Sequence, residues 1–256
     1  MTVRYDVSGA RATITIDDPE RRNPMSVETM GGLLERTHEA MDDPEVRVLV
    51  YTGAGDRAFC AGGDLSGSFV DDPIGLHRGR GDIARLFALM MRGGKPTVAR
   101  VNGHALAGGF GLAVACDVTI CVDDARLGTT EVKVGLWPMM ISAVLVRVMP
   151  RKAALELMLT GRVITPEEAQ RLGAVSRVVS RDELDGVVDE VVDGLISSSP
   201  VALMMGKDSF YAMTDAGLGT AFDRLQGGLT EIAMTEDARE GVAAFIEKRK
   251  PQWGGR

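Results

Sequence analysis

The stretch that decides the fold is Thr97–Glu131, TVARVNGHALAGGFGLAVACDVTICVDDARLGTTE. It opens with an apolar, β-branched run over 97–101, which is typical of a buried strand. A tight polar turn follows, and the glycine-rich segment 107–111 then leads into 112–116, which the apolar pattern predicts to be a short buried helix. A second predicted strand over 118–122 completes a strand–turn–helix–strand unit.

The glycines at the start of this helix have two interpretations. Glycine lets a ligand approach the backbone closely, and the first N–H groups of a helix have no partner within the helix. Such free donors suit an oxygen that carries or develops negative charge. The alternative is that the glycines only let the helix pack tightly on the strand, and this stretch alone does not separate the two.

Working outward, strands and helices alternate until about residue 199, and only helices are predicted beyond it. Strands are predicted at 3–7, 11–17, 47–52, 97–101, 118–122 and 175–179. Helices are predicted at 26–41, 82–91, 112–116, 141–149, 151–159, from 165, 180–196, 201–213, 217–233 and 237–249. Residues 66–79 contain glycine, aspartate and proline and are interpreted as a mobile loop. The predicted fold class is α/β, with a core domain over 1–199 and a helical region over 200–256.

The composition excludes several classes of protein. Apolar residues make up 45% and charged residues 25% of the chain, as in a soluble globular protein with one large core. The net charge of -7 argues against nucleic acid as a partner. No apolar run is long enough to span a bilayer, so no membrane partner is expected, and the N-terminus lacks a signal-peptide pattern. The three cysteines, an odd number, favour reduced thiols and a cytoplasmic location.

A second glycine turn, at 60–64, also follows a strand region. Together with 107–109 it could supply one backbone N–H each to the same oxygen. That arrangement is an oxyanion hole, which is useful when a thioester carbonyl becomes an enolate. Sequence spacing alone does not show that the two turns meet.

Glu131 is the acidic candidate beside these turns. It lies in a loop of small residues before a largely apolar segment, and partial burial raises the pKa of a carboxyl group toward neutrality, which suits a general acid or base. A surface glutamate that pairs with Lys133 or caps a turn is the more common outcome for such a residue. Met139 and Met140, beside Trp137, could form the wall of an apolar acyl pocket.

Other polar residues suggest structural roles. We expect Asp117 to make a turn or a salt bridge, and His104 to bond to the backbone. The three histidines have no metal-ligand spacing and the cysteines do not form C-x-x-C, so no metal site is expected. The glycines at 53 and 55 resemble a dinucleotide fingerprint, but the chain breaks at 61–64 where that motif requires a long helix.

These residues resemble the enoyl-CoA hydratase/isomerase (crotonase) superfamily over nearly the whole chain. The matching blocks are RNPMS (22–26), AFCAGGDL (58–65), KPTVARVNGHALAGGFGLAVACD (95–117), LGTTEVKVGLWP (127–138), ALELMLTGRVITPEEAQRLGAVSRVV (154–179) and DAREGVAAFIEKRKPQW (237–253). The resemblance implies a crotonase-like spiral of ββα units with a helical C-terminal region that builds trimers, often paired as hexamers.

The resemblance also implies roles for individual residues. The N–H groups of Ala61 and Gly108 would form the oxyanion hole for an acyl-CoA thioester, and Glu131 would transfer the proton. Coenzyme A would contact Arg22, Ala61, Asp64 and Leu65, and it would enter only as part of the substrate, with no separate cofactor. Phe245 and Lys248 would reach the coenzyme A bound to a neighbouring subunit.

One departure from the family pattern bears on the reaction. Typical hydratases of this family carry two glutamates, and at the position of the first this chain has Gly111. Moving a double bond needs only one base, so the sequence favours Δ3-Δ2-enoyl-CoA isomerisation. Hydration of a 2-enoyl-CoA and non-catalytic acyl-CoA binding remain alternatives, and Asp71 or Asp72 could supply a replacement acid. Met139 stands where dienoyl isomerases need an aspartate, which argues against that reaction.

Overall fold

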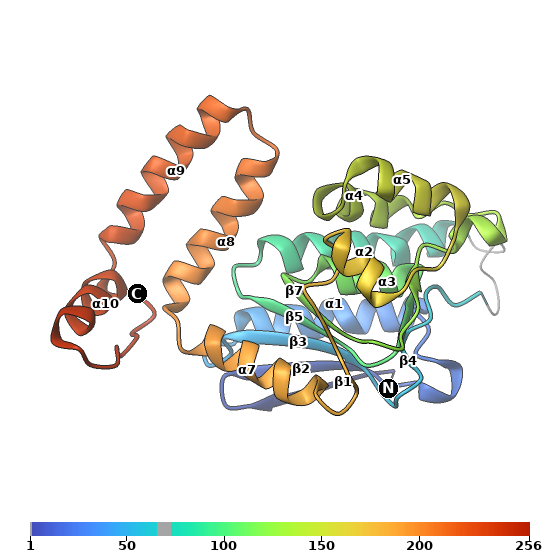
Figure 1. Ribbon diagram of the computed structural model, residues 1–256, viewed down its shortest axis with the longest axis horizontal. Coiled ribbons are helices and arrows are strands. Elements are labelled where there is room, and N and C mark those ends of the chain that lie inside the picture. The colour runs from blue at the N-terminus through green and yellow to red at the C-terminus, as the bar shows by residue number, and fades with distance from the viewer. Residues whose placement is uncertain (1, 66–72) are drawn as a thin grey trace.

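The computed structural model describes residues 2–65 and 73–256, and it is an α/β protein built on two sheets (Figure 1). The strands are β1 (Val3–Ser8), β2 (Arg11–Ile16), β3 (Val48–Gly53), β4 (Ala58–Cys60), β5 (Thr97–Val101), β6 (His104–Leu106), β7 (Val118–Val122), β8 (Leu127–Gly128) and β9 (Arg177–Val179). The helices are α1 (Val27–Asp42), α2 (Pro73–Arg92), α3 (Gly108–Ala115), α4 (Met139–Val148), α5 (Arg151–Thr160), α6 (Pro166–Arg171), α7 (Leu184–Ile196), α8 (Pro200–Thr214), α9 (Leu218–Ala233) and α10 (Glu236–Glu247). Two 3-10 turns are η1 (Pro19–Arg21) and η2 (Glu131–Val134).

The larger sheet has the strand order β1-β2-β3-β5-β7-β9. Its first pair, β1 and β2, is the predicted antiparallel hairpin, and every later pairing is parallel. The smaller sheet, β4-β6-β8, is parallel throughout. From β3 to β8, each pair of successive strands places its first strand in the larger sheet and its second strand in the smaller sheet, and a helix follows. The chain therefore winds as a spiral.

Helices cover both faces of the larger sheet. Neighbouring side chains of a strand point to opposite faces, so contacts from the strands reach helices on each side. On one face, the Tyr51 hydroxyl lies 2.8 Å from the hydroxyl of Thr37 in α1. On the other face, Arg100 forms an ion pair of 2.6 Å with Asp185 in α7. All six residues of β3 are therefore buried, as the apolar run over 47–52 predicts.

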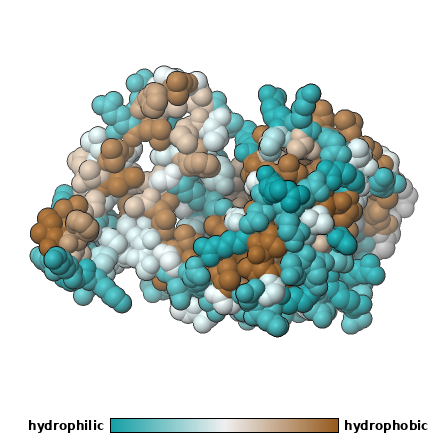
Figure 2. Space-filling view, viewed as in Figure 1, coloured by the Kyte–Doolittle hydropathy of each residue, from teal (hydrophilic) through white to brown (hydrophobic). Residues whose placement is uncertain are grey.

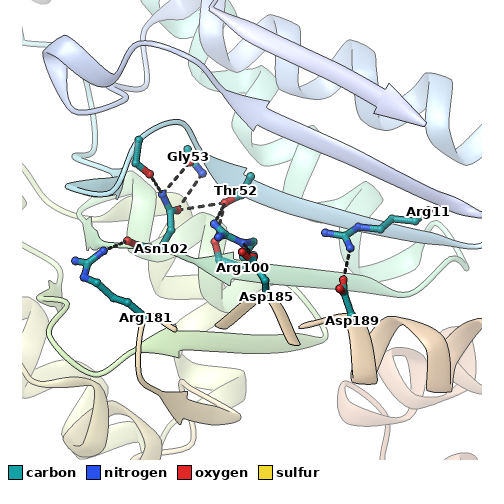
Figure 3. A network of polar contacts seen from close by, with 9 residues as sticks. Arg11, Thr52, Gly53, Arg100, Asn102, Arg181, Asp185 and Asp189 are labelled. Carbon is teal, nitrogen blue, oxygen red and sulfur yellow. Dashed lines mark hydrogen bonds and ion pairs between the residues drawn. The ribbon is translucent and has the colours of Figure 1, made fainter. Parts of the chain in front are cut away.

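A polar network holds the turn between β5 and β6, and so fixes where the glycine-rich segment begins (Figure 3). The Asn102 amide donates to the carbonyl oxygens of Gly53 at 2.8 Å and Gly55 at 2.6 Å, and its oxygen accepts from the Gly53 N–H. Arg181 donates to the Asn102 carbonyl oxygen at 3.0 Å. These bonds join the ends of two neighbouring strands.

The predicted starts of α2 and α7 are wrong. The loop predicted over 66–79 is helical from Pro73, because the fixed φ of proline suits the first turn of a helix; the part of this loop before it lies outside the described residues. The helix expected from Ser180 begins at Leu184. The Ser180 hydroxyl and N–H both donate to the Glu183 carboxylate, which closes a turn ahead of the helix.

Helices α8, α9 and α10 extend away from the sheets (Figure 1). The side chain of Lys207 in α8 is buried and anchors this region, because it donates to Met90 O, Lys95 O and Asp117 Oδ2 at 2.6–2.8 Å. The Tyr211 hydroxyl donates to the same aspartate at 3.0 Å. The prediction that Asp117 is salt-bridged is confirmed. None of the helices in the described part of the chain has the length and apolarity to cross a bilayer.

Candidate active site

The two glycine turns meet in space. Strand β4 pairs with β6, which places the turn after Cys60 beside the turn before α3. The contact is so close that a Cβ on Gly62 would lie 2.6 Å from the Ala107 Cβ, and a Cβ on Gly109 would lie 2.3 Å from the Cys60 carbonyl oxygen. Glycine is therefore required at both positions by packing, and this packing brings two backbone segments to one place.

The second turn presents the Gly108 amide. Helix α3 begins at Gly108 rather than at 112, and its first internal bond runs from Gly111 N to Ala107 O at 3.1 Å. The amide of Gly108 comes before that bond and has no acceptor within the described chain. Ala107 has a φ of 49°, which is unusual for a residue with a side chain, and this backbone conformation sets the direction of the peptide between Ala107 and Gly108.

At the first turn the predicted donor is wrong. The Ala61 N–H is occupied, because it donates to the Arg22 carbonyl oxygen at 3.0 Å. The next bonds along the turn run from Met25 N to Gly62 O and from Asp64 N to Met25 O. Gly63 lies between them, and its N–H has no acceptor among residues 2–65 and 73–256. The Gly62 N–H donates to the Cys60 sulfur, so the free amide of this turn is, among the described residues, that of Gly63.

Gly63 and Gly108 line one cavity of about 850 Å³. Of the residues predicted for the site, Ala61, Asp64, Leu65, Glu131, Trp137 and Met139 line the same cavity. Most of its wall is apolar, with Met25, Ile83, Phe87, Met140 and Ile141 among the lining residues. Ile83 and Phe87 were not predicted as site residues, because the sequence indicates only that 82–91 is helical.

Glu131 is the first residue of η2 and lines this cavity. Its Oε2 atom is buried and has no hydrogen-bond partner in the described structure. Burial raises the pKa of the Glu131 carboxyl above its ordinary value of 4.5. The alternative of a surface glutamate paired with Lys133 is wrong, because no ion pair joins these two described residues and the carboxyl lies inward.

The geometry is that of a site for a carbonyl compound: two free amides and one desolvated carboxyl share an apolar cavity. The sequence model of the enoyl-CoA hydratase/isomerase family matches residues 7–256. The chain belongs to the enoyl-CoA hydratase/isomerase family.

Individual relatives agree with this assignment. The chain is 38% identical over 250 residues to a Thermus thermophilus protein named as a candidate enoyl-CoA hydratase, covering 96% of this chain and 98% of the relative. It is 34% identical over 253 residues to the carnitinyl-CoA dehydratase of Proteus mirabilis, covering 97% and 96%. A solved enoyl-CoA hydratase from Mycobacterium smegmatis superposes with a TM-score of 0.94 at 30% identity, covering 99% of each chain. The crotonase fold expected from the sequence is confirmed.

This chain has no room for a side chain at position 111, where typical hydratases of the family carry their first glutamate. A Cβ on Gly111 would lie 2.7 Å from Cγ1, 3.2 Å from Cγ2 and 3.3 Å from Cδ1 of Ile141. Ile141 is buried and also lines the cavity. An apolar side chain from α4 therefore fills the space where a side chain from α3 would stand. Asp71 and Asp72, considered as replacement acids, lie outside the described residues.

The remaining predicted contacts are placed differently. Arg22 is exposed and does not line the cavity, although its carbonyl oxygen holds Ala61. Phe245, 85% exposed, and Lys248 lie at the end of α10, away from this cavity in the same chain. Their assignment to a neighbouring subunit's coenzyme A stays a prediction.

The histidine expected to bond to the backbone does so: His104 Nδ1 accepts from the Arg126 N–H at 3.1 Å. Cys60, Cys116 and Cys121 are buried as free thiols, and burial raises the pKa of Cys60 to about 12. A thiol in that state is a poor nucleophile at neutral pH. The expectation that the site needs no metal stays a prediction.

Proposed function

We propose that this member of the family isomerises a 3-enoyl-CoA to the 2-enoyl-CoA. The observation that carries the proposal is that Glu131 is the one carboxyl without an ion pair among the described residues that line the cavity, where the other family acid position is occupied by Ile141. Asp64, the second described carboxyl in the lining, forms an ion pair of 2.6 Å with Arg21. The thioester carbonyl oxygen would accept hydrogen bonds from the amides of Gly63 and Gly108, in place of the pair with Ala61 expected from the sequence.

In this mechanism Glu131 acts as both base and acid. Its carboxylate removes a proton from C2 of the substrate, and the electron pair of that C–H bond passes into the conjugated enolate, whose negative oxygen is stabilised by the two amides. The same carboxyl then returns the proton at C4, which leaves the double bond between C2 and C3. No water is added or lost, so one carboxyl suffices.

Hydration of a 2-enoyl-CoA, or the reverse dehydration, is the second candidate. The names of the relatives favour it, because one is a candidate hydratase and another a carnitinyl-CoA dehydratase. In that case Glu131 would activate water alone. Ile141 fills the space that a side chain at position 111 would need, which argues against a second carboxyl at that position.

The test is to incubate the enzyme separately with a 3-enoyl-CoA and with crotonyl-CoA. Isomerisation predicts formation of the 2-enoyl-CoA from the first and no hydration of the second. Hydration of crotonyl-CoA without turnover of the 3-enoyl-CoA would contradict the proposal in favour of the second candidate. Binding of both without turnover would assign the chain as an acyl-CoA binder.

We further propose that the protein assembles as a trimer or hexamer through α8, α9 and α10. Figure 2 shows apolar side chains gathered over α9 and α10. Large apolar residues here that are at least half exposed are Phe210, Leu218, Phe222, Leu229, Met234, Val242, Phe245 and Ile246. An exposed apolar surface of this kind is typical of a subunit interface.

A further inference from the structure

A second cavity of about 460 Å³ lies beyond the wall of the active-site cavity. Its walls come from α2, α4 and α8, with Asp215 just after α8 and Arg224 near the middle of α9, and we call it the back cavity. Phe87 and Met140 line both cavities. These two side chains therefore form the partition between the active site and the back cavity.

The helical repeat shows how the lining passes from one cavity to the other. Along α2, Ile83 lines only the active-site cavity, Phe87 lines both, and Met91 lines only the back cavity. Along α4, Met140 lines both and Val144 lines only the back cavity. Residues four apart lie on one face of a helix, so each helix contributes a continuous apolar stripe that runs through the partition.

The partition is closed in this structure. Phe87 is only 4% exposed, and Met140 is half-buried and packs against the hydrophobic core. The lining that the two stripes contribute is apolar, whereas the rest of the lining includes the charged residues Arg92, Arg147, Asp215 and Arg224, with an ion pair of 2.8 Å between Arg147 and Asp215. The stripes therefore suit a hydrocarbon chain, but the chain is stopped at Phe87 and Met140.

We propose that Phe87 and Met140 set the length of the acyl chain that the enzyme accepts. This inference rests on the proposed acyl-CoA substrate, but it does not depend on which reaction follows. An acyl chain that enters between Glu131 and the two amides runs along the apolar wall and ends at the partition. Truncating either partition residue joins the two cavities, and longer chains then gain buried methylene groups.

The experiment measures binding of saturated straight-chain acyl-CoA thioesters by titration calorimetry, from butanoyl-CoA to hexadecanoyl-CoA, to the wild-type protein and three variants. Saturated thioesters are used because they bind without turning over. For the wild-type protein, affinity is expected to rise by about fourfold per methylene up to a limiting length and then to stop rising. The variants are Phe87→Ala, Met140→Ala and the control Met91→Ala, in which the truncated side chain lines only the back cavity.

Phe87→Ala and Met140→Ala are expected to move the limiting length by at least two carbons, with a gain of about fourfold to sixteenfold at the newly accepted lengths. Met91→Ala is expected to keep the wild-type limit. An unchanged limit in both partition variants, or an equal shift in Met91→Ala, overturns the inference and leaves the acyl-CoA substrate standing. Failure of every thioester to bind the wild-type protein overturns both the inference and the proposed function. Met140 is half-buried, so Met140→Ala tests the inference even if Phe87→Ala fails to fold.

Discussion

Glu131 is a carboxyl group whose charge is poorly solvated in the free enzyme. Its Oε2 atom is buried without a hydrogen-bond partner in the described structure, and burial raises its pKa. A carboxylate in this state is a stronger base than one in water, which is the property that proton removal next to a thioester requires. Its place after a small-residue loop made Glu131 a candidate but by itself favoured a surface glutamate, because the burial of the carboxyl depends on the tertiary packing around η2.

Glu131→Gln is expected to lower turnover of the proposed 3-enoyl-CoA substrate by roughly 10²-fold to 10⁴-fold, because glutamine cannot accept the proton. Steady-state kinetics measures the loss, and binding of a saturated acyl-CoA should persist. Glu35→Gln, at an exposed glutamate of α1, is the control and should keep wild-type turnover. Equal rates for Glu131→Gln and the wild-type enzyme would remove Glu131 from the mechanism.

The pH dependence of kcat/KM should report the same carboxyl. Proton removal needs the ionised form, so activity is expected to fall as the pH decreases through the pKa of Glu131, which lies above 4.5. A pH–rate profile between pH 4 and 9 measures this limb. An acidic limb at or below 4.5 would contradict a desolvated base.

The raised pKa also predicts an effect on folding stability. The folded state binds the Glu131 proton more tightly than the unfolded state, so ionised Glu131 destabilises the fold, and this loss is present above the folded pKa and disappears below the unfolded value. Glu131→Gln is therefore expected to raise the free energy of unfolding at pH 7 by about 1 kcal/mol. Urea unfolding at pH 7 and at pH 4 tests the sign, and a gain that was larger at pH 4 would contradict it.

The error at Ala61 shows where residue-level prediction ends. The sequence indicated a glycine turn that could present an amide. It did not indicate which of the N–H groups of Ala61, Gly62 and Gly63 is free. The choice among them depends on Arg22, 39 positions earlier, whose carbonyl oxygen takes the Ala61 amide. Hydrogen bonds between distant segments leave no local pattern.

At the scale of elements, helix starts with a side-chain cap were predictable. Ser26 and Thr165 each accept a hydrogen bond from the N–H three residues later, as their capping motifs predict. The packing of α4 on α3 was not predictable. It depends on Ile141 reaching the bare Cα of Gly111, and the sequence indicated only that an acid was missing there.

This packing predicts energetic coupling between the two helices. Gly111→Glu alone is expected to cost about 1–3 kcal/mol through overpacking against Ile141. Ile141→Ala removes all three contacting atoms, so the double variant should lose clearly less than the sum of the two single losses. Denaturant unfolding of the wild-type protein, the two single variants and the double variant measures this coupling. Additive losses of unfolding free energy would show that the two positions do not compete for space.

At the scale of the whole molecule, the sequence predicted that strands stop near 199, and the described elements beyond that point are all helices, whereas the division into two domains there stays a prediction. The attachment of the C-terminal helices was not visible, because the buried contacts of Lys207 join α8 to residues 90, 95 and 117. Few side chains of α8, α9 and α10 are buried in the single chain. Their apolar surface is the basis for the proposed assembly.

Phe222→Lys and Leu229→Lys are expected to shift the protein toward monomers, because each places a charge on the exposed apolar face of α9. Size-exclusion chromatography with light scattering measures the mass. Val7→Lys, at an exposed apolar position of β1, is the control and should keep the wild-type mass. A wild-type protein that elutes as a monomer would contradict the proposed trimer or hexamer.

The conformation of Ala107 has a consequence for thermostable redesign of this enzyme. An alanine at φ 49° and ψ -126° is strained by roughly 1–3 kcal/mol relative to glycine, so Ala107→Gly looks like a simple stabilising change. The same methyl group restricts rotation of the peptide that points the Gly108 amide into the cavity. Glycine at position 107 would let the Gly108 amide turn away from the cavity. A substitution selected only for heat resistance would therefore lower the catalytic rate.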